Sequence, residues 1–335
     1  MGVDSMLECG KVTDAVYKRS VQKILSGWQL KDGCSVRVNR DGCELGKKGK
    51  ELLSAASAVL VGSDRHTAAG AVHQAMNQLT AAGGEPEGIL LQFMVPAGME
   101  ESELKVLTAS AAAACTWLKI PVGQSDVTVI PGLKEPAVTA TAVGKTEGLF
   151  RTEPAKVDQD IIMTGFAGWK GSVKLSEAYK DRLEQHFNPV FLEKLLYIDK
   201  SGDAFSCVPA VSAAANAGVR TMYAAGDGGV FNAVWELACR YGLGVRIHLK
   251  AIPIRQETVE VCDYFNVSPY QLLSTGVLLM TADHGQKVLT ELAAAGIPAV
   301  IIGHLTDDND RVVLNDEEVR YLEPFRQDSI HQIIN

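Results

Sequence analysis

Short apolar runs alternate with helical patterns in the first half of the chain. Residues 58–61 form an apolar run typical of a strand, and the segment after them repeats apolar residues at helical spacing up to the glycines at 83–84. A second strand is predicted at 88–95 and a helix at about 102–118. This alternation is typical of an α/β domain.

Two runs rich in β-branched residues follow, at 125–130 and 137–143, separated by a Pro-Gly turn. They predict a hairpin-like pair of strands. The polar segment from 144 to 158 contains glycine and proline and predicts a domain boundary. We therefore expect an N-terminal domain at 1–150 and a C-terminal domain at 151–335.

The second half repeats the alternation of strands and helices. Its predicted elements are, in chain order, a strand at 161–163, helices at about 176–197 and 206–217, a strand at 219–223, a helix after residue 229, a strand from Leu278, a helix at about 285–295 and a strand at 299–302. A length of 335 residues fits two domains, since a domain usually has about 100–200 residues.

Charge and hydropathy exclude several kinds of partner. The chain carries 32 Lys and Arg against 40 Asp and Glu, a formal net charge of −8. Binding to a phosphate backbone needs a basic surface, so we expect no nucleic-acid partner. No apolar run approaches the roughly 20 residues that span a bilayer, and no basic-then-apolar leader opens the chain, so we expect no membrane contact.

The seven cysteines are scattered and none forms a C-x-x-C pair, which favours neither a disulfide framework nor a thiolate zinc site. Reduced, buried thiols are typical of the cytosol, so we expect a cytoplasmic protein.

The acidic run at 307–310 lacks the glycine and the closing glutamate of a calcium loop, so it predicts a turn.

The sharpest local motif is the glycine-rich turn at 226–229, between a predicted strand and a predicted helix. At such a helix N-terminus, backbone N–H groups and the helix dipole favour a phosphate. The glycines match neither the dinucleotide fingerprint nor the P-loop, and Asp227 repels a bare phosphate. Two interpretations stay open: a phosphate site made by Gly226, Asp227, Gly228 and Gly229, or a tight turn in which Asp227 caps the helix.

A second glycine cluster, at 165–171, also follows a strand, and its Lys170 offers a cation to a phosphate; the alternative is a loop with an exposed lysine.

His66 and His73 lie two helical turns apart, with Asp64 nearby. Two histidines without a third ligand make a poor metal site, so we expect solvated polar side chains there.

Four segments of the second half resemble the C-terminal domain of the AIR (aminoimidazole ribonucleotide) synthase-related family, and within it hydrogenase maturation factors of the carbamoyl-dehydratase type. They are 160–172, 225–236, 252–257 and 269–276, in the family's order and with similar spacing. The first half resembles the family more loosely, at Gly10-Lys11, 83–86 and 123–126.

The resemblance implies a two-domain AIR synthase-like α/β (α+β) fold. Its N-terminal mixed-sheet domain would pair through its sheet into a homodimer, and its C-terminal domain would be α/β. It also implies an ATP site between the domains and across the dimer, and a maturation protein as partner. Matching the family's motifs, the residues expected to contact nucleotide or phosphate are Lys11, Asn77, Lys170 and the turn at 226–229.

The family's acidic residues are largely absent from the matching positions. Ala56 aligns with a metal-binding aspartate, Asn77-Gln78 with an Asn-Asp pair, and Gln124 with a loop acid. Alanine cannot ligate a metal and glutamine brings no charge, which argues against magnesium in the usual place. Asp64 and Asp126 are the carboxylates left as metal ligands.

The chain also has no cysteine after Cys262, whereas the carbamoyl-dehydratase type ends in a cysteine that carries the modified group. Two hypotheses follow. The favoured one is a divergent paralogue that keeps the fold and dimer, has lost the magnesium–ATP carboxylates and binds a nucleotide or another anion. The alternative is an active ATP-dependent enzyme of phosphoryl transfer or amide activation, with Asp64, Asp126 and Asp227 as substitute ligands.

Overall fold

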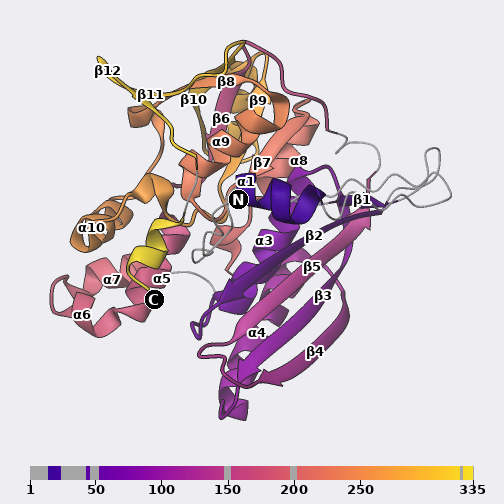
Figure 1. Ribbon diagram of the computed structural model, residues 1–335, viewed down its shortest axis with the longest axis vertical. Coiled ribbons are helices and arrows are strands. Elements are labelled where there is room, and N and C mark those ends of the chain that lie inside the picture. The colour runs from indigo at the N-terminus through magenta and orange to yellow at the C-terminus, as the bar shows by residue number, and fades with distance from the viewer. Residues whose placement is uncertain are drawn as a thin grey trace, which may run out of the picture.

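The computed structural model describes residues 14–23, 43–45, 53–146, 152–196, 202–324 and 327–334. The first part of the chain contains a five-stranded sheet. Its strands are β1 (Cys43–Leu45), β2 (Leu53–Val61), β3 (Glu85–Pro96), β4 (Val122–Ile130) and β5 (Ala137–Lys145), and the helices are α1 (Asp14–Tyr17) with the π-turn η1 (Lys18–Gln22), α3 (Thr67–Ala81) and α4 (Glu101–Leu118). Figure 1 shows α3 and α4 together on one face of this sheet.

The strand order of this sheet is β1-β2-β5-β3-β4, so the predicted hairpin of 125–130 and 137–143 is wrong. Helix α4 carries the chain across from β3 to β4, which pair in parallel, and β5 then lies antiparallel between β2 and β3. The reason lies in burial. β5 places Val138, Ala140 and Ala142 in the core, whereas β4 is exposed along its length and forms the sheet's edge.

Helix α3 is buried on all sides, and only Gln78 of its residues is partly accessible. One side packs on the first sheet and the other on the C-terminal domain, at β7 and α8. A helix rich in small and apolar side chains and buried on all sides is typical of such a central position. Both histidines of α3's region, His66 and His73, are 1% and 0% exposed, so the expectation of solvated side chains is wrong.

The second part of the chain contains a seven-stranded sheet in the order β12-β11-β8-β10-β6-β9-β7. Its strands are β6 (Asp160–Thr164), β7 (Thr221–Ala224), β8 (Gly244–His248), β9 (Leu278–Ala282), β10 (Ala299–Thr306), β11 (Arg311–Asn315) and β12 (Glu318–Tyr321). Its helices are α5 (Trp169–Ala178), α6 (Lys180–Glu184), α7 (Pro189–Leu196), α8 (Val208–Asn216), α9 (Gly229–Tyr241), α10 (Gln256–Phe265) and α11 (Gly285–Ala294), with the 3-10 turns η3 (Asp203–Phe205), η4 (Leu249–Ala251), η5 (Pro269–Gln271) and η6 (Ser329–Gln332).

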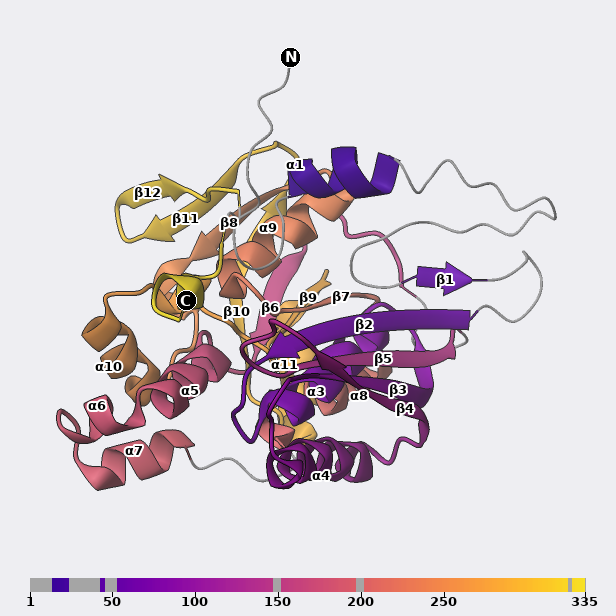
Figure 2. The ribbon, with the colours of Figure 1, turned by 60° about the horizontal axis from the view of Figure 1, so that its bottom comes forward.

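Both faces of this sheet are covered, which explains its continuous apolar runs. On β6, Ile161 and Met163 point into a core shared with α9, and Ile162 points into a core shared with α8 and α11. Figure 2 shows the hairpin of β11 and β12 beyond this layered region. The strand β8, the helix α10 and this hairpin were not predicted from the sequence, and the helix expected at 176–197 is broken into α5, α6 and α7.

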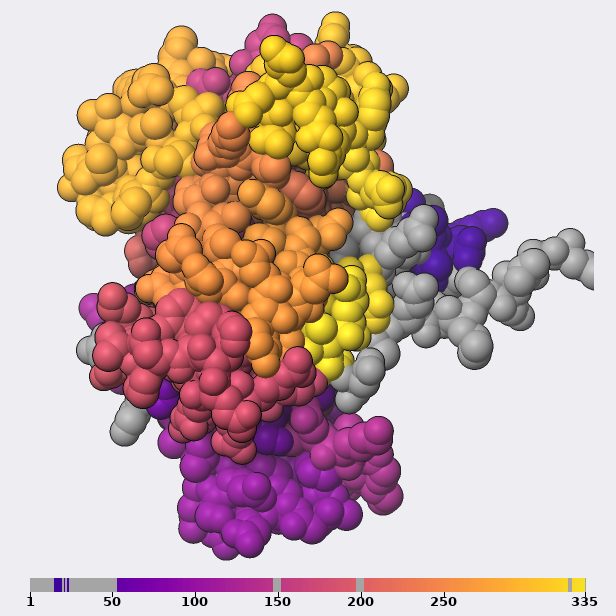
Figure 3. Space-filling view, turned by 90° about the vertical axis from the view of Figure 1, so that its left-hand side faces the viewer, coloured from indigo at the N-terminus to yellow at the C-terminus, as the bar shows by residue number. Residues whose placement is uncertain are grey.

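Helices α5, α6, α7 and α10 form a separate cluster with the C-terminal segment 327–334, whose Ile330 is buried against them. In Figure 3 the pink and orange helices of this cluster adjoin the yellow C-terminal segment, above the purple N-terminal domain. The turn predicted at 307–310 is confirmed, since Asp308 Oδ1 accepts hydrogen bonds from the Thr306 hydroxyl and the Asp310 N–H. No helix in the described ranges is long and apolar enough to cross a bilayer.

Candidate functional site

A cavity of about 560 Å³ lies between the two domains, and we call it the interdomain cavity. The loop 62–65 forms its wall on the N-terminal side and helix α5 forms its wall on the C-terminal side. Glu135, Lys180, Leu196 and Ile334 complete the lining. Its ligand-facing groups therefore come from both domains at once.

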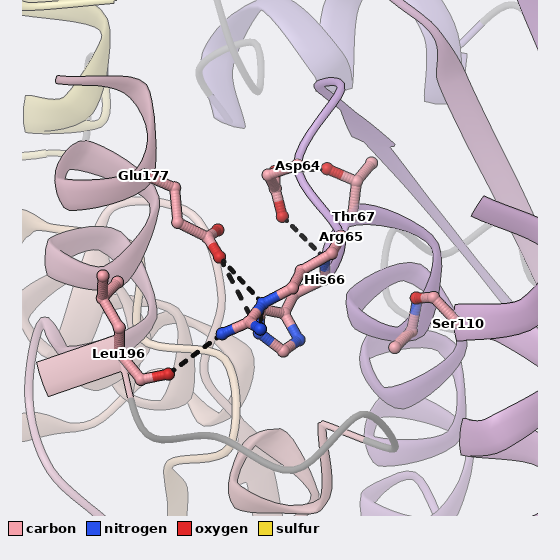
Figure 4. A network of polar contacts seen from close by, with 8 residues as sticks. Asp64, Arg65, His66, Thr67, Ser110, Glu177 and Leu196 are labelled. Atoms are coloured by element: carbon pink, nitrogen blue, oxygen red, sulfur yellow. Dashed lines mark hydrogen bonds and ion pairs between the residues drawn. The ribbon is translucent and has the colours of Figure 1, made fainter. Parts of the chain in front are cut away.

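Asp64 organises the loop that leads from β2 into α3. Its Oδ1 accepts the His66 N–H at 2.9 Å and its Oδ2 accepts the Thr67 hydroxyl, as Figure 4 shows in part. His66 is the N-cap of α3 and Thr67 its first residue, so both bonds tie the loop to the start of the helix, although they satisfy none of its free helical N–H groups. Asp64 thus fixes the start of α3 while its carboxylate stays at the cavity wall.

Helix α5 supplies the opposite wall. Lys170, Lys174 and Glu177 are spaced by four and three residues, which places them on one face of the helix. Lys174 Nζ donates to the backbone carbonyl of Val61 at 2.6 Å, so it ties α5 to the end of β2. Arg65, Lys174 and Lys180 line the cavity together with the carboxyl groups of Asp64, Glu135 and Glu177, so its lining carries charges of both signs.

Lys170 is the exception among these cations, because it is only 1% exposed. Its Nζ lies 4.5 Å from the centroid of the Phe205 ring and has no hydrogen-bond partner among the described residues. Burial lowers the pKa of Lys170, although the carboxylates of Asp64 and Glu177 oppose this shift. The predicted alternative of an exposed lysine is therefore wrong.

The two carboxyl groups near Lys170 titrate differently. Burial disfavours the charged form of Asp64, but the Lys170 ammonium and the Thr67 hydroxyl together hold its pKa below the usual value. Burial and then the charge of Asp64 raise the pKa of Glu177 to about 7. Asp64 therefore stays ionised at neutral pH, and Glu177 is close to half protonated.

His66 completes this group of side chains. Burial, followed by the charges of Lys170 and Arg65, lowers its pKa to about 4, so the ring is neutral. Arg65 Nε donates to His66 Nε2 at 3.1 Å, which leaves the ring proton on Nδ1, and that nitrogen has no partner among the described residues. Arg65 also reaches Glu177 Oε1 at 3.5 Å and the Leu196 carbonyl at 3.2 Å (Figure 4).

Three buried polar atoms, Lys170 Nζ, His66 Nδ1 and Glu177 Oε2, thus lack hydrogen-bond partners among the described residues at the domain boundary. Buried polar groups in proteins are almost always paired, and an unpaired one costs free energy. Of these residues, Glu177 lines the interdomain cavity, whereas Lys170 and His66 do not. This concentration of unsatisfied and titration-shifted groups marks the region as the candidate functional site.

The glycine-rich turn lies at the N-terminus of α9, as predicted, and it already binds a carboxyl group from its own chain. Gly228 N–H donates to Asp328 Oδ2 at 2.6 Å, and Asp328 Oδ1 accepts the Ile330 N–H at 2.9 Å. Asp328 is 0% exposed, and burial together with the charge of Asp227 raises its pKa to about 7. Asp227 makes no side-chain cap of α9, so the predicted capping role is wrong.

Asn77 lies in the middle of α3 and faces the C-terminal domain rather than a cavity. Its Nδ2 donates to the Phe205 carbonyl at 2.8 Å, and its Oδ1 accepts the Cys207 N–H at 2.9 Å. It is 0% exposed. Both ends of the amide are therefore used to join the two domains.

Both halves of the chain match models of one protein family. The model described as AIR synthase related protein, N-terminal domain, matches residues 47–146, and that of the C-terminal domain matches residues 204–315. The chain belongs to the AIR synthase-related family. Among curated relatives, it is 25% identical to carbamoyl dehydratase HypE of Rhizobium leguminosarum bv. viciae over 251 residues, which cover 72% of this chain and 69% of the relative. The same enzyme of Azotobacter vinelandii is 27% identical over 251 residues, covering 72% of this chain and 70% of the relative.

Solved structures of the AIR synthase-related family share the fold. HypE of E. coli superposes with a TM-score of 0.70 at 17% identity, covering 83% of this chain and 87% of that one. The AaThiL structure, complexed with AMPPCP and TMP, has a TM-score of 0.67 at 17% identity. The match covers 93% of this chain and 95% of that one. The prediction of an AIR synthase-like α/β fold is confirmed by these matches.

The structure separates the residues that the family resemblance grouped. Asp126 lies on the edge strand β4, where its Oδ2 accepts a hydrogen bond from Gln92 at 3.3 Å, and it shares no described contact with Asp64. Ala56 is buried in β2, and Gln124 is exposed on β4. Lys11 falls outside the described residues. The described residues contain no group of three or more His, Cys, Asp or Glu side chains that could hold a metal.

Several residues of the candidate site were not predicted from the sequence. Arg65, Lys174, Glu177 and Asp328 all depend on contacts between distant parts of the chain. The helical spacing of Lys170, Lys174 and Glu177 was visible in the sequence and could have grouped these three. Nothing in the local pattern around Asp328 pointed to the glycine-rich turn 100 residues earlier.

Proposed function

We propose that this member of the AIR synthase-related family binds a nucleotide or a related anion without the family's magnesium–ATP carboxylates. The observation that carries the proposal is the interdomain cavity. Arg65, Lys174 and Lys180 line its wall beside the carboxyl groups of Asp64, Glu135 and Glu177, and the ammonium of Lys170, unpartnered among the described residues, adds a further cation at the domain boundary. Cations and a buried unpaired donor favour phosphate oxygens.

Similar proteins support a nucleotide as the ligand. A HypE structure in complex with ATP covers 95% of this chain with a TM-score of 0.63, and AaThiL was solved with AMPPCP. A structure of HypE with HypF makes a maturation protein the expected partner. The magnesium-dependent alternative is less favoured, because Asp64 is engaged by Thr67 and His66 while Asp126 lies on β4 beside Gln92.

Thermal unfolding with ADP or ATP tests the proposal, in magnesium and in EDTA. A ligand at 100 times its Kd adds about 2.7 kcal/mol to the free energy of unfolding. We expect an upward shift of Tm that persists in EDTA. Lys174→Ala should weaken binding by about tenfold, the loss of one charge-assisted contact. Lys105→Ala is the matched control, since Lys105 is exposed on α4 and pairs with Glu101 at 2.7 Å.

The outcomes separate the hypotheses. A shift that needs magnesium supports the active ATP-dependent enzyme with substitute ligands. No shift with either nucleotide, or an equal loss in Lys174→Ala and Lys105→Ala, contradicts nucleotide binding in this cavity.

We further propose that the chain forms a homodimer through the face of the first sheet that lies opposite α3 and α4. On β2, Leu53, Val59 and Val61 point away from the helices and are 53%, 59% and 45% exposed. A sheet face with exposed apolar side chains is typical of an interaction surface. The double variant Leu53→Lys/Val59→Lys should halve the molar mass measured by light scattering. Val319→Lys on the distant strand β12, equally exposed at 57%, should leave the mass unchanged.

A further inference from the structure

A larger cavity, of about 700 Å³, lies within the C-terminal domain, and we call it the C-terminal cavity. It opens where β6 ends and β9 and β10 begin, between α8 and α11. The loop 164–169 closes one side and the turn η3 closes another. A volume of this size is typical of small-molecule sites, which span about 300–1,000 Å³.

The walls of the C-terminal cavity are mainly apolar and partly aromatic. Phe166 and Trp169 meet edge to face, with ring centroids 6.2 Å apart and planes at 85°. Leu289 and Ile297 contribute aliphatic surface from α11 and the loop after it. Phe166 is 39% exposed, so its ring is accessible without unfolding of the surrounding core.

Asp203 is the one charged side chain among the described residues that line this cavity, and none of them is Lys, Arg or His. Asp203 Oδ1 accepts the Ala204 N–H at 2.8 Å, while Oδ2 has no hydrogen-bond partner in the described part of the chain. Arg255 lies over the Trp169 ring at 4.5 Å but does not line the cavity, and Glu257 is 3.5 Å from its Nε. The cavity thus presents one negative charge and no compensating cation from its described lining.

Two further polar groups at the cavity wall lack partners. Thr275 is 5% exposed, and its Oγ1 has no hydrogen-bond partner among the described residues; the same holds for Trp169 Nε1. Buried unpaired hydroxyl and N–H groups cost free energy in the protein alone. A small adjustment of either side chain would let it contact a bound molecule.

We infer that the C-terminal cavity binds an apolar organic cation, a molecule with an aromatic or alkyl body and a protonated amine. The body packs against Phe166, Leu289 and Ile297, and the ammonium pairs with Oδ2 of Asp203. Aromatic side chains also attract such cations through their ring faces. Nucleotides and other anions are repelled, because the nearest charge is negative.

Three probes of nearly the same size separate charge from shape: phenethylamine, 2-phenylethanol and 3-phenylpropionate. We expect the amine to bind best and the acid worst in ligand-observed NMR titrations of the full chain. Asp203→Asn keeps the acceptor for the Ala204 N–H and removes the charge. It should therefore lower the affinity for the amine by about tenfold and leave the affinity for the alcohol unchanged.

Two tryptophan substitutions on α11 localise the binding. Ala293 lines the C-terminal cavity and Ala294, the next residue, does not, although both are exposed. Ala293→Trp should abolish binding of the amine and the alcohol, and Ala294→Trp should preserve it. Equal affinities for amine and acid, equal effects of the two tryptophans, or no saturable binding of phenethylamine at millimolar concentration would overturn the inference.

Discussion

The two cavities differ in where their charges come from. The interdomain cavity combines the cations Arg65, Lys174 and Lys180 with the carboxyl groups of Asp64, Glu135 and Glu177, drawn from both domains, whereas the C-terminal cavity takes its one described charge, Asp203, from a single domain. An anionic ligand therefore finds cations in the interdomain cavity and none in the described lining of the C-terminal cavity. The interdomain site also depends on how the domains are held together, and the C-terminal site depends mainly on the packing of α8 and α11.

Loss of the contact that Asn77 makes between the two domains should have the largest effect of the changes considered, and it should lower the free energy of unfolding. Asn77→Ala leaves the Phe205 carbonyl and the Cys207 N–H buried without partners. We expect a loss of about 2–4 kcal/mol in the free energy of unfolding, measured by urea denaturation, because each unsatisfied buried group costs about 1–3 kcal/mol. Asn309→Ala, in an exposed turn, is the control and should change stability little. A loss no larger than the control's would show that Asn77 does not join the domains.

Glu177 should give stability a pH dependence that the C-terminal cavity does not share. Its pKa is raised from 4.5 to about 7, so the folded state holds a proton that the unfolded state has lost. Its contribution to the free energy of unfolding therefore falls as pH rises from 4.5 to 7 and is constant outside that window. Glu177→Gln should flatten this decline in denaturation curves.

The lowered pKa of His66, about 4, acts in the opposite direction, because stability from the neutral ring is lost as pH falls from 6.5. Glu193→Gln, exposed on α7, provides the comparison for Glu177→Gln. An unchanged slope in Glu177→Gln would exclude Glu177 as the buried proton carrier.

Ionic strength should have a smaller effect, and it should weaken ligand binding more in the interdomain cavity than in the C-terminal cavity. A nucleotide carries several negative charges and meets several cations, while an amine meets one carboxylate. Raising the ionic strength to physiological values should lower the affinity for ADP by about threefold or more. It should lower the affinity for phenethylamine by less than about twofold, since screening acts on each charge pair. Parallel calorimetric titrations measure both. Equal salt sensitivity would mean that the two sites do not differ in charge as described.

The elements that follow from local pattern were predictable, and those set by distant contacts were not. The strand–glycine–helix geometry at Gly226–Gly229 follows from short-range preferences, and the apolar run of β6 follows from burial on both faces. Strand β5 pairs with β2 and β3 rather than with β4, and two adjacent β-branched runs in the sequence cannot show this pairing. His66 and Lys170 look like surface residues in the sequence, yet the packing of α3 between two domains buries both.

The candidate site follows the same division. Asp64 and Lys170 were identified individually, but their electrostatic coupling arises only when the loop 62–65 meets α5. The separation of Asp126 from Asp64 likewise reflects the position of β4 at the sheet's edge.

The bond between Asp328 and the glycine-rich turn has a consequence for competition. The carboxylate belongs to the same folded domain as Gly228, and the C-terminal segment is further held by Ile330 in the core and by the Tyr179 hydroxyl, which donates to the Ile333 carbonyl at 2.7 Å. A ligand attached in this way acts at an effective concentration of about millimolar or more. A free phosphate would have to outcompete that tethered carboxylate, so the turn is reserved for the chain's own C-terminal segment unless the segment first detaches.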